Sequence, residues 1–167
     1  MYLLDTDVVS NFRKRKPHPR LLEWFESVPP DEVAVSVMTV FEIQAGASLL
    51  RSTNPAKADE IEDWLDGFVL TGSFVSLPLD TDVARLYARM FVSPSLKNFV
   101  LPDPKSKRPK SGADLMLAAT AITRGATLVT VNGNDFLRIH AEFPLSAIYE
   151  PFAMNWLVGG SDRSREI

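Results

Sequence analysis

Four acidic residues, Asp5, Glu42, Asp114 and Asp135, stand where a helical pattern begins along the chain. Apolar, strand-like runs precede Asp5, Glu42 and Asp135, whereas a polar loop precedes Asp114. In an open α/β sheet such positions lie together at the carboxyl edge of the strands, where ligands bind. Carboxylates gathered there repel one another unless a cation neutralises them. The pattern therefore predicts a site for a divalent metal ion.

Metal-assisted hydrolysis is the chemistry expected of such a site. Hard oxygen ligands without histidine or cysteine select Mg²⁺ or Mn²⁺. The chain has no cysteine, and we interpret its two histidines, His18 and His140, as surface residues. One or two such ions lower the pKa of a bound water and neutralise charge on the leaving oxygen of a phosphodiester. Hydrolysis of a nucleic-acid backbone is the reaction that suits this site best.

Each acid also has a purely structural interpretation. Asp5 would cap the first helix, and Asp135 would shape a turn or complement a helix dipole. Glu42 and Asp114 each stand three residues after a hydroxyl side chain, which is the spacing of a capping box. The joint pattern favours the metal site, because Asp5 ends an almost wholly apolar strand, where a charge without a partner is unfavourable.

The elements that must position these acids alternate along the chain. Strands are predicted at residues 2–4, 33–37, 74–77, 127–131 and 145–149. Helices are predicted at residues 6–13, 21–28, 38–50, 54–69, 82–90, 111–124 and 135–140. This alternation predicts an α/β fold with a central, mostly parallel sheet flanked by helices on both faces. Residues 93–112, rich in proline and lysine, are predicted to form a long exposed loop.

Length and composition are those of one globular domain. The chain has 167 residues, of which 46% are hydrophobic and 23% charged, which argues against disorder. A formal net charge of −3 gives no overall attraction to nucleic acid, although a local basic rim would still hold phosphates. No signal peptide and no apolar run long enough to cross a membrane is visible. A cytoplasmic location is the default expectation.

Four segments carry a resemblance to a known family, at residues 3–10, 39–46, 114–121 and 130–136. Each contains one of the four acids, and in this order and spacing they resemble the motifs of PIN-domain ribonucleases. Within that family the chain is most similar to the VapC and FitB-like toxins of bacterial toxin–antitoxin pairs. The resemblance implies a PIN-like nuclease domain at residues 1–152. The tail at residues 153–167 matches no motif of the family and is predicted to be partly disordered.

The resemblance also implies roles for individual residues. Catalytic and metal-binding roles fall on the acids of the four motifs: Asp5, Glu42, Asp114 and Asp135. The last of these is expected to assist directly or through water. Supporting roles around the ligands fall on three neighbours: Asp7, Thr130 and Asn132.

Partners follow from the same resemblance. An antitoxin is expected to block the acidic pocket with a basic segment and to bind operator DNA, and a homodimer is expected. RNA is the implied substrate. Candidate RNA contacts are basic side chains of the loop and of the segment after the first helix: Arg13, Lys97, Lys105, Lys107, Arg108 and Lys110. Their alternative interpretation is that they are solvated loop charges.

Two other functions compete with this one. Residues 5–9 (Asp-Thr-Asp-Val-Val) resemble the nucleophile motif of haloacid-dehalogenase-type phosphatases, in which Asp5 would attack phosphate and Asp7 would act as acid and base. That family also requires a downstream lysine and a late acidic motif, and the late region here offers only Asn-Gly-Asn-Asp at 132–135. The second alternative is a non-catalytic acidic pocket that receives an arginine of a partner.

Overall fold

A mostly parallel sheet forms the centre of the computed structural model, which describes residues 1–71, 74–101 and 112–160. Within these ranges the strands form one six-stranded sheet in the order β3-β2-β1-β4-β5-β6. Their bounds are β1 (Tyr2–Leu4), β2 (Val33–Ser36), β3 (Val75–Leu77), β4 (Thr127–Val129), β5 (Ala147–Glu150) and β6 (Asn155–Val158). Strands β1 to β5 run parallel, and β6 pairs with β5 in the antiparallel sense.

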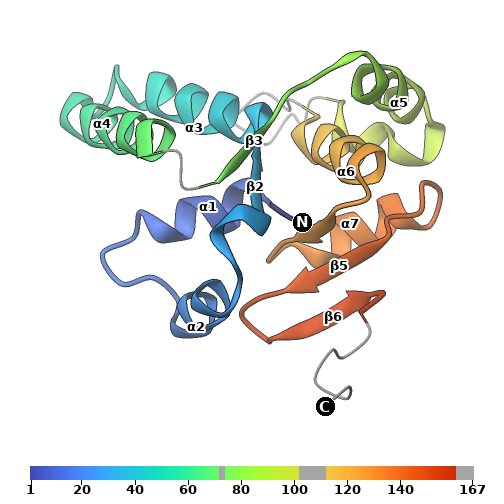
Figure 1. Cartoon of the computed structure of the whole chain (residues 1–167). Coiled ribbons are helices and arrows are strands. Elements are labelled where there is room, and N and C mark those ends of the chain that lie inside the picture. The colour runs from blue at the N-terminus through green and yellow to red at the C-terminus, as the bar shows by residue number, and fades with distance from the viewer. Residues whose placement is uncertain (72–73, 102–111, 161–167) are drawn as a thin grey trace.

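Helices cover both faces of this sheet (Figure 1). The α-helices are α1 (Thr6–Phe12), α2 (Pro19–Ser27), α3 (Val37–Leu50), α4 (Pro55–Thr71), α5 (Thr81–Phe91), α6 (Ala113–Arg124) and α7 (Gly133–His140). Two short 3-10 helices are η1 (Pro30–Glu32) and η2 (Pro94–Phe99). The predicted α/β fold, with its mostly parallel sheet between two helical layers, is confirmed.

Alternation along the strands produces two separate apolar cores. Leu3 of β1 faces the core shared with α5, α6 and α7, whereas Leu4 faces the core shared with α1 to α4. Both side chains are fully or almost fully buried. Because successive side chains of a strand point to opposite faces, the near-continuous apolar runs of β1, β2 and β4 are what a sheet covered on both faces requires.

The order of the strands brings the predicted acids to one edge. From β1 the chain moves outward through β2 to β3, and β4 then pairs with the other side of β1 and leads to β5. The carboxyl ends of β1 and β4 therefore lie side by side at the switch point of the sheet. Asp5, directly after β1, donates its backbone N–H to the carbonyl of Val129 at the end of β4.

Residues 93–101 differ from the exposed loop that the sequence predicts. Their central part is η2, in which Leu96 is 1% and Phe99 is 8% exposed against the core of α5, α6 and α7. The Ser93 hydroxyl donates to Glu142 Oε1 over 2.8 Å, which ties the start of η2 to the segment that follows α7. The proline and lysine residues of this segment favour a loop in the prediction, although it also contains a short apolar pattern. The remainder of the predicted loop, residues 102–111, lies outside the described residues.

The boundary drawn from the sequence at residue 152 also differs from the structure. Residues 155–158 form β6 at the edge of the sheet, and the Trp156 ring packs against Tyr149 of β5 with centroids 5.0 Å apart. The sheet of the domain therefore extends at least to Val158. Such a short strand is hard to predict, because its hydrogen bonds and packing depend on β5 being in place. Residues 161–167 of the predicted tail lie outside the described residues.

Among the described helices, none is long and apolar enough to span a membrane.

Candidate metal centre

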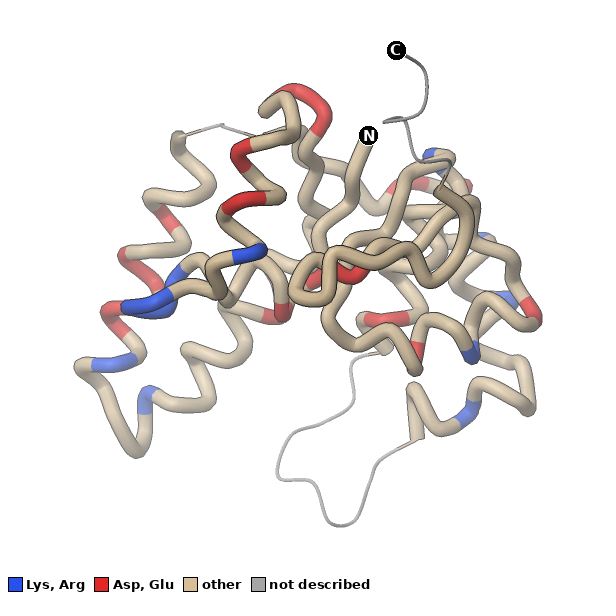
Figure 2. The backbone as a smooth tube through the Cα atoms, turned by 90° about the horizontal axis from the view of Figure 1, so that it is seen from below, with Lys and Arg blue, Asp and Glu red and all other residues tan. Residues whose placement is uncertain are grey.

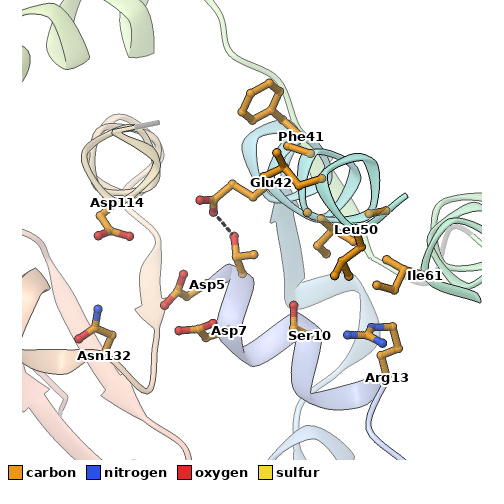
Figure 3. Close-up of a pocket in the computed structure, with 16 residues that line it drawn as sticks. Asp5, Asp7, Ser10, Arg13, Phe41, Glu42, Leu50, Ile61, Asp114 and Asn132 are labelled. Carbon is orange, nitrogen blue, oxygen red and sulfur yellow. Dashed lines mark hydrogen bonds between the residues drawn. The ribbon is translucent and has the colours of Figure 1, made fainter. Parts of the chain in front are cut away.

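A pocket of about 490 Å³ opens at the carboxyl edge of the sheet, between α1, α3 and α6 (Figure 3). Three of the four predicted acids line it, namely Asp5, Glu42 and Asp114. The predicted neighbours Asp7 and Asn132 line it as well. In Figure 3 these five side chains surround a common space, although they come from four separate segments of the chain. Figure 2 shows acidic segments near the middle of the molecule and also in its outer parts, where the basic segments lie as well.

Asp5 is the most buried acid of the pocket, with only 4% of its surface exposed. It stands at the N-cap position of α1, but its side chain makes no capping hydrogen bond. Instead, the Thr130 hydroxyl donates to Asp5 Oδ2 over 2.7 Å. The pKa of Asp5 is raised to about 7, mainly by burial and also by the charges of Asp114 and Asp7, against the lowering effect of the Thr130 bond. A capping role alone does not explain this carboxylate.

Glu42 reaches the pocket from the second turn of α3. The Thr6 hydroxyl donates to Glu42 Oε2 over 2.6 Å, which links the start of α1 to α3 (dashed line in Figure 3). The capping box predicted for Glu42 is absent, because α3 begins at Val37 and its N-cap is Ser36, whose hydroxyl accepts from the Met38 N–H. The side chain of Glu42 is thus directed at the pocket rather than at the end of its own helix.

Asp114 enters from the first turn of α6. The N-cap of this helix is Gly112, with a φ of 67°, so Asp114 stands at the second helical position and not at the third, as a capping box requires. A helix N-terminus attracts a carboxylate. The charge of Asp114 is one of the causes that raise the pKa of Asp5, after the larger effect of burial.

Asp135 does not line the pocket. It lies in the first turn of α7, where Asn132 Nδ2 donates to Asp135 Oδ2 over 2.8 Å and Arg138 lies 3.6 Å from Oδ1. Asn132 itself lines the pocket, and its backbone N–H donates to the Thr130 hydroxyl. The structure therefore places Asp135 one hydrogen bond behind the pocket, with Asn132 between them.

The donor set suits a hard divalent cation. Carboxylates and the amide side chain of Asn132 line the pocket, and the pKa of Asp5 is raised mainly by burial and additionally by the charges of Asp114 and Asp7. In the described part of the chain, no three acidic or histidine side chains close around a point as a complete ligand shell. Mg²⁺ requires no such cage, because it is commonly held by one or two carboxylates while waters and substrate phosphates supply the other positions. The residues present therefore fit Mg²⁺ or Mn²⁺.

Other predicted site residues are less centrally placed or lie elsewhere. Arg13 lines the far end of the same pocket. Lys97 is an exposed residue of η2 and does not line it. The other candidate RNA contacts lie outside the described residues: Lys105, Lys107, Arg108 and Lys110.

Thr6 and Ser10 line the pocket but were not identified from the sequence. Their helical spacing with Arg13 was the available signal, since positions i, i+4 and i+7 share one face of a helix. Both histidines are only partly exposed, contrary to the surface interpretation. The ring of His18 stacks on Phe152 with centroids 4.1 Å apart, and His140 Nδ1 accepts from the Leu145 N–H.

Comparison with known proteins identifies the class to which this fold and site belong. Residues 2–142 match the model of the PIN domain, and the chain belongs to the PIN-domain family. It is 30% identical to the toxin FitB of Neisseria gonorrhoeae (strain ATCC 700825 / FA 1090) over 139 residues, which cover 81% of this chain and 91% of that protein. It is 36% identical to the ribonuclease VapC14 of Mycobacterium tuberculosis (strain CDC 1551 / Oshkosh) over 69 residues, 41% of this chain and 67% of that one.

A solved structure of FitAB bound to the IR36 DNA fragment is also similar. It contains a chain with a TM-score of 0.66 and 27% identity, covering 91% of this chain and 96% of that chain. The predicted resemblance to FitB-like and VapC-like PIN domains is confirmed. Residues 5–9 lie within the range that matches the PIN domain, and the alternative of a haloacid-dehalogenase-type phosphatase has no support.

Proposed function

We propose that this protein is a metal-dependent endoribonuclease, the toxin of a toxin–antitoxin pair, which hydrolyses RNA phosphodiester bonds with Mg²⁺ or Mn²⁺. The observation that carries the proposal is the pocket in which the buried Asp5 faces Asp114 and Glu42. The family of this chain supports the proposal, because one relative, FitB, is named a toxin and another, VapC14, is named a ribonuclease.

The residues of the pocket have different proposed roles. Asp5, Glu42 and Asp114 would hold the cation, and Asp7 and Asn132 would complete the polar wall around it. Thr130 holds the Asp5 carboxylate by its hydrogen bond, and Thr6 holds that of Glu42. A bound Mg²⁺ or Mn²⁺ supplies activation of the attacking water and neutralisation of charge on the leaving oxygen. Asp135 orients Asn132 from behind the pocket.

Cleavage of RNA with and without metal tests this function. The purified protein is expected to cut RNA internally when Mg²⁺ or Mn²⁺ is present. No cleavage is expected when EDTA removes the metal, and none from the Asp5→Asn variant. Asp66→Asn, an exposed acid of α4, serves as the matched control and is expected to leave cleavage unchanged. Equal cleavage by the wild type and Asp5→Asn would contradict the metal-nuclease proposal.

Partners are proposed on the same basis. The structure of FitAB on DNA is a complex containing a relative of this chain. We infer that a cognate antitoxin binds this protein and blocks the acidic pocket, and that operator DNA is bound through the antitoxin. A homodimer and a cytoplasmic location belong to the same proposal. Co-purification with the product of a neighbouring small reading frame, and loss of RNA cleavage in that complex, would test the antitoxin. If the pocket only captured a partner's arginine, binding would occur without cleavage by the free protein.

A further inference from the structure

The pocket continues past the acids along one face of α1. Thr6, Ser10 and Arg13 are spaced i, i+4 and i+7, and all three line it. At 1.5 Å per residue, Arg13 lies about 12 Å along the helix from Asp5. One end of the pocket therefore carries carboxylates and the other a guanidinium, with hydroxyl side chains between them (Figure 3).

The opposite wall comes from α3 and is shaped to leave this passage open. Ala45 and Gly46 lie beyond Glu42 on the lining, and a Cβ added at Gly46 would meet nothing within 4 Å. Phe41, at the rim, has 55% of its surface exposed, so its ring is accessible to a ligand. An exposed aromatic ring beside a groove can hold single-stranded nucleic acid by base stacking.

Arg13 is available to bind a ligand. It is half-buried, and within residues 1–71, 74–101 and 112–160 no carboxylate forms an ion pair with it. The acid that its charge influences, Glu60, is held mainly by Lys57, whose Nζ lies 2.6 Å from Glu60 Oε1. Arg20, in contrast, is already engaged with the Phe152 carbonyl.

We propose that Arg13 binds one phosphate of the RNA strand, a few nucleotides from the phosphate that is cleaved at the acids. The inference rests on the proposed function, since the strand must enter the same pocket to reach Asp5. The planar guanidinium offers paired donors that match phosphate oxygens. An acidic segment of a protein partner also has charge complementary to Arg13. The RNA strand is favoured because its phosphates are able to bind at both ends of the pocket, to the metal-loaded acids at one end and to the Arg13 guanidinium at the other.

The test measures binding separately from cleavage. Asp5→Asn protein in Mg²⁺ is titrated with a labelled RNA oligonucleotide, followed by fluorescence anisotropy. Each phosphate of the oligonucleotide is replaced in turn by a neutral methylphosphonate. Arg13→Ala, Arg13→Lys and Arg15→Ala are compared in the same background; Arg15 belongs to the same basic segment but is exposed and outside the pocket lining. Thermal melts verify that each variant is folded.

Arg13→Ala is expected to weaken binding about tenfold, as loss of a hydrogen-bonded charge does. It is also expected to reduce the slope of log K against log salt by about 0.7, the value for one phosphate on a single strand. A methylphosphonate at one particular position should weaken RNA binding by protein that retains Arg13 and should leave binding by Arg13→Ala unchanged. Arg13→Lys should give an intermediate effect, and Arg15→Ala should behave like the parent protein. If no phosphate is coupled to Arg13 although the wild type cleaves RNA, the inference is wrong and the proposed function stands. Loss of antitoxin binding alone in Arg13→Ala would also overturn it, in favour of the acidic segment.

Discussion

The hydroxyl of Thr6 donates a 2.6 Å hydrogen bond to Glu42 Oε2, joining the first residue of α1 to the second turn of α3. Thr6 Oγ1 also lies 3.4 Å from the Thr39 hydroxyl, which is fully buried. A hydroxyl has one hydrogen to donate, and the shorter contact assigns it to Glu42. The Glu42 carboxylate of the candidate metal centre is therefore held by Thr6, which directly follows Asp5, a second acid of the centre, in the sequence.

Replacing Thr6 by valine keeps the shape of the side chain and removes this bond. We expect metal affinity and RNA cleavage to fall about 10- to 100-fold, as is usual when a partner of a metal ligand is lost. Isothermal titration with Mn²⁺ measures the affinity. Thr6→Ser retains the hydroxyl and is expected to bind metal nearly as the wild type does; equal losses in both variants would point to packing instead of the hydrogen bond.

Stability of the metal-free protein should depend on the charge of Asp5. Burial raises its pKa from 3.8 to about 7, partly offset by the Thr130 hydrogen bond and increased by Asp114 and Asp7. Because the folded state holds the proton more tightly than the unfolded state, this stabilising contribution is complete below about pH 3.8 and is lost as the pH rises through about 7. The loss is on the order of 4 kcal/mol.

Asp5→Asn carries no charge at any pH and should lack this loss. Urea unfolding in EDTA is expected to show the variant gaining stability relative to the wild type between about pH 4 and about pH 7. Asp66→Asn, on the exposed face of α4, is the control and should follow the wild type. Parallel pH profiles for the wild type and Asp5→Asn would show that Asp5 is not the titrating group.

Asp135 and Asn132 should differ from Asp5 in the size of their effects. Asp135 acts on the pocket only through Asn132, so Asp135→Asn is expected to weaken metal binding less than Asp5→Asn does. If Asp135 serves to orient Asn132, then Asn132→Ala and the double variant should have the same metal affinity, because the two effects are not additive when residues act in series. A further loss in the double variant would indicate direct contact between Asp135 and the ion.

Packing of η2 provides a test of the segment that the sequence analysis assigned to a loop. Leu96 is almost fully buried, and Leu96→Ala is expected to destabilise the protein by about 2–5 kcal/mol through the cavity it leaves. Leu101, with 52% of its surface exposed, provides the control, and Leu101→Ala should change stability by less than about 0.5 kcal/mol. Equal effects in urea unfolding would contradict the packing described for η2.

The amino-acid sequence alone predicts the alternation of strands and helices, because hydrophobic periodicity and turn residues are local properties of the chain. It also identified Asp5, Glu42 and Asp114, since their motifs stand at the ends of strands or the starts of helices. It left open whether Asp135 assists directly or through water, because the motif of Asp135 has similar local features. It missed β6, which depends on a non-local pairing with β5.

The way in which these residues meet depends on the tertiary structure. The carboxyl ends of β1 and β4 lie side by side because the strand order reverses there, and this places Thr130 against Asp5 across 125 positions of sequence. It also decided that Thr6 supports Glu42 and that Arg13 shares the pocket with the acids. Such contacts depend on the angle and depth at which helices pack on the sheet, and no local pattern of residues encodes them.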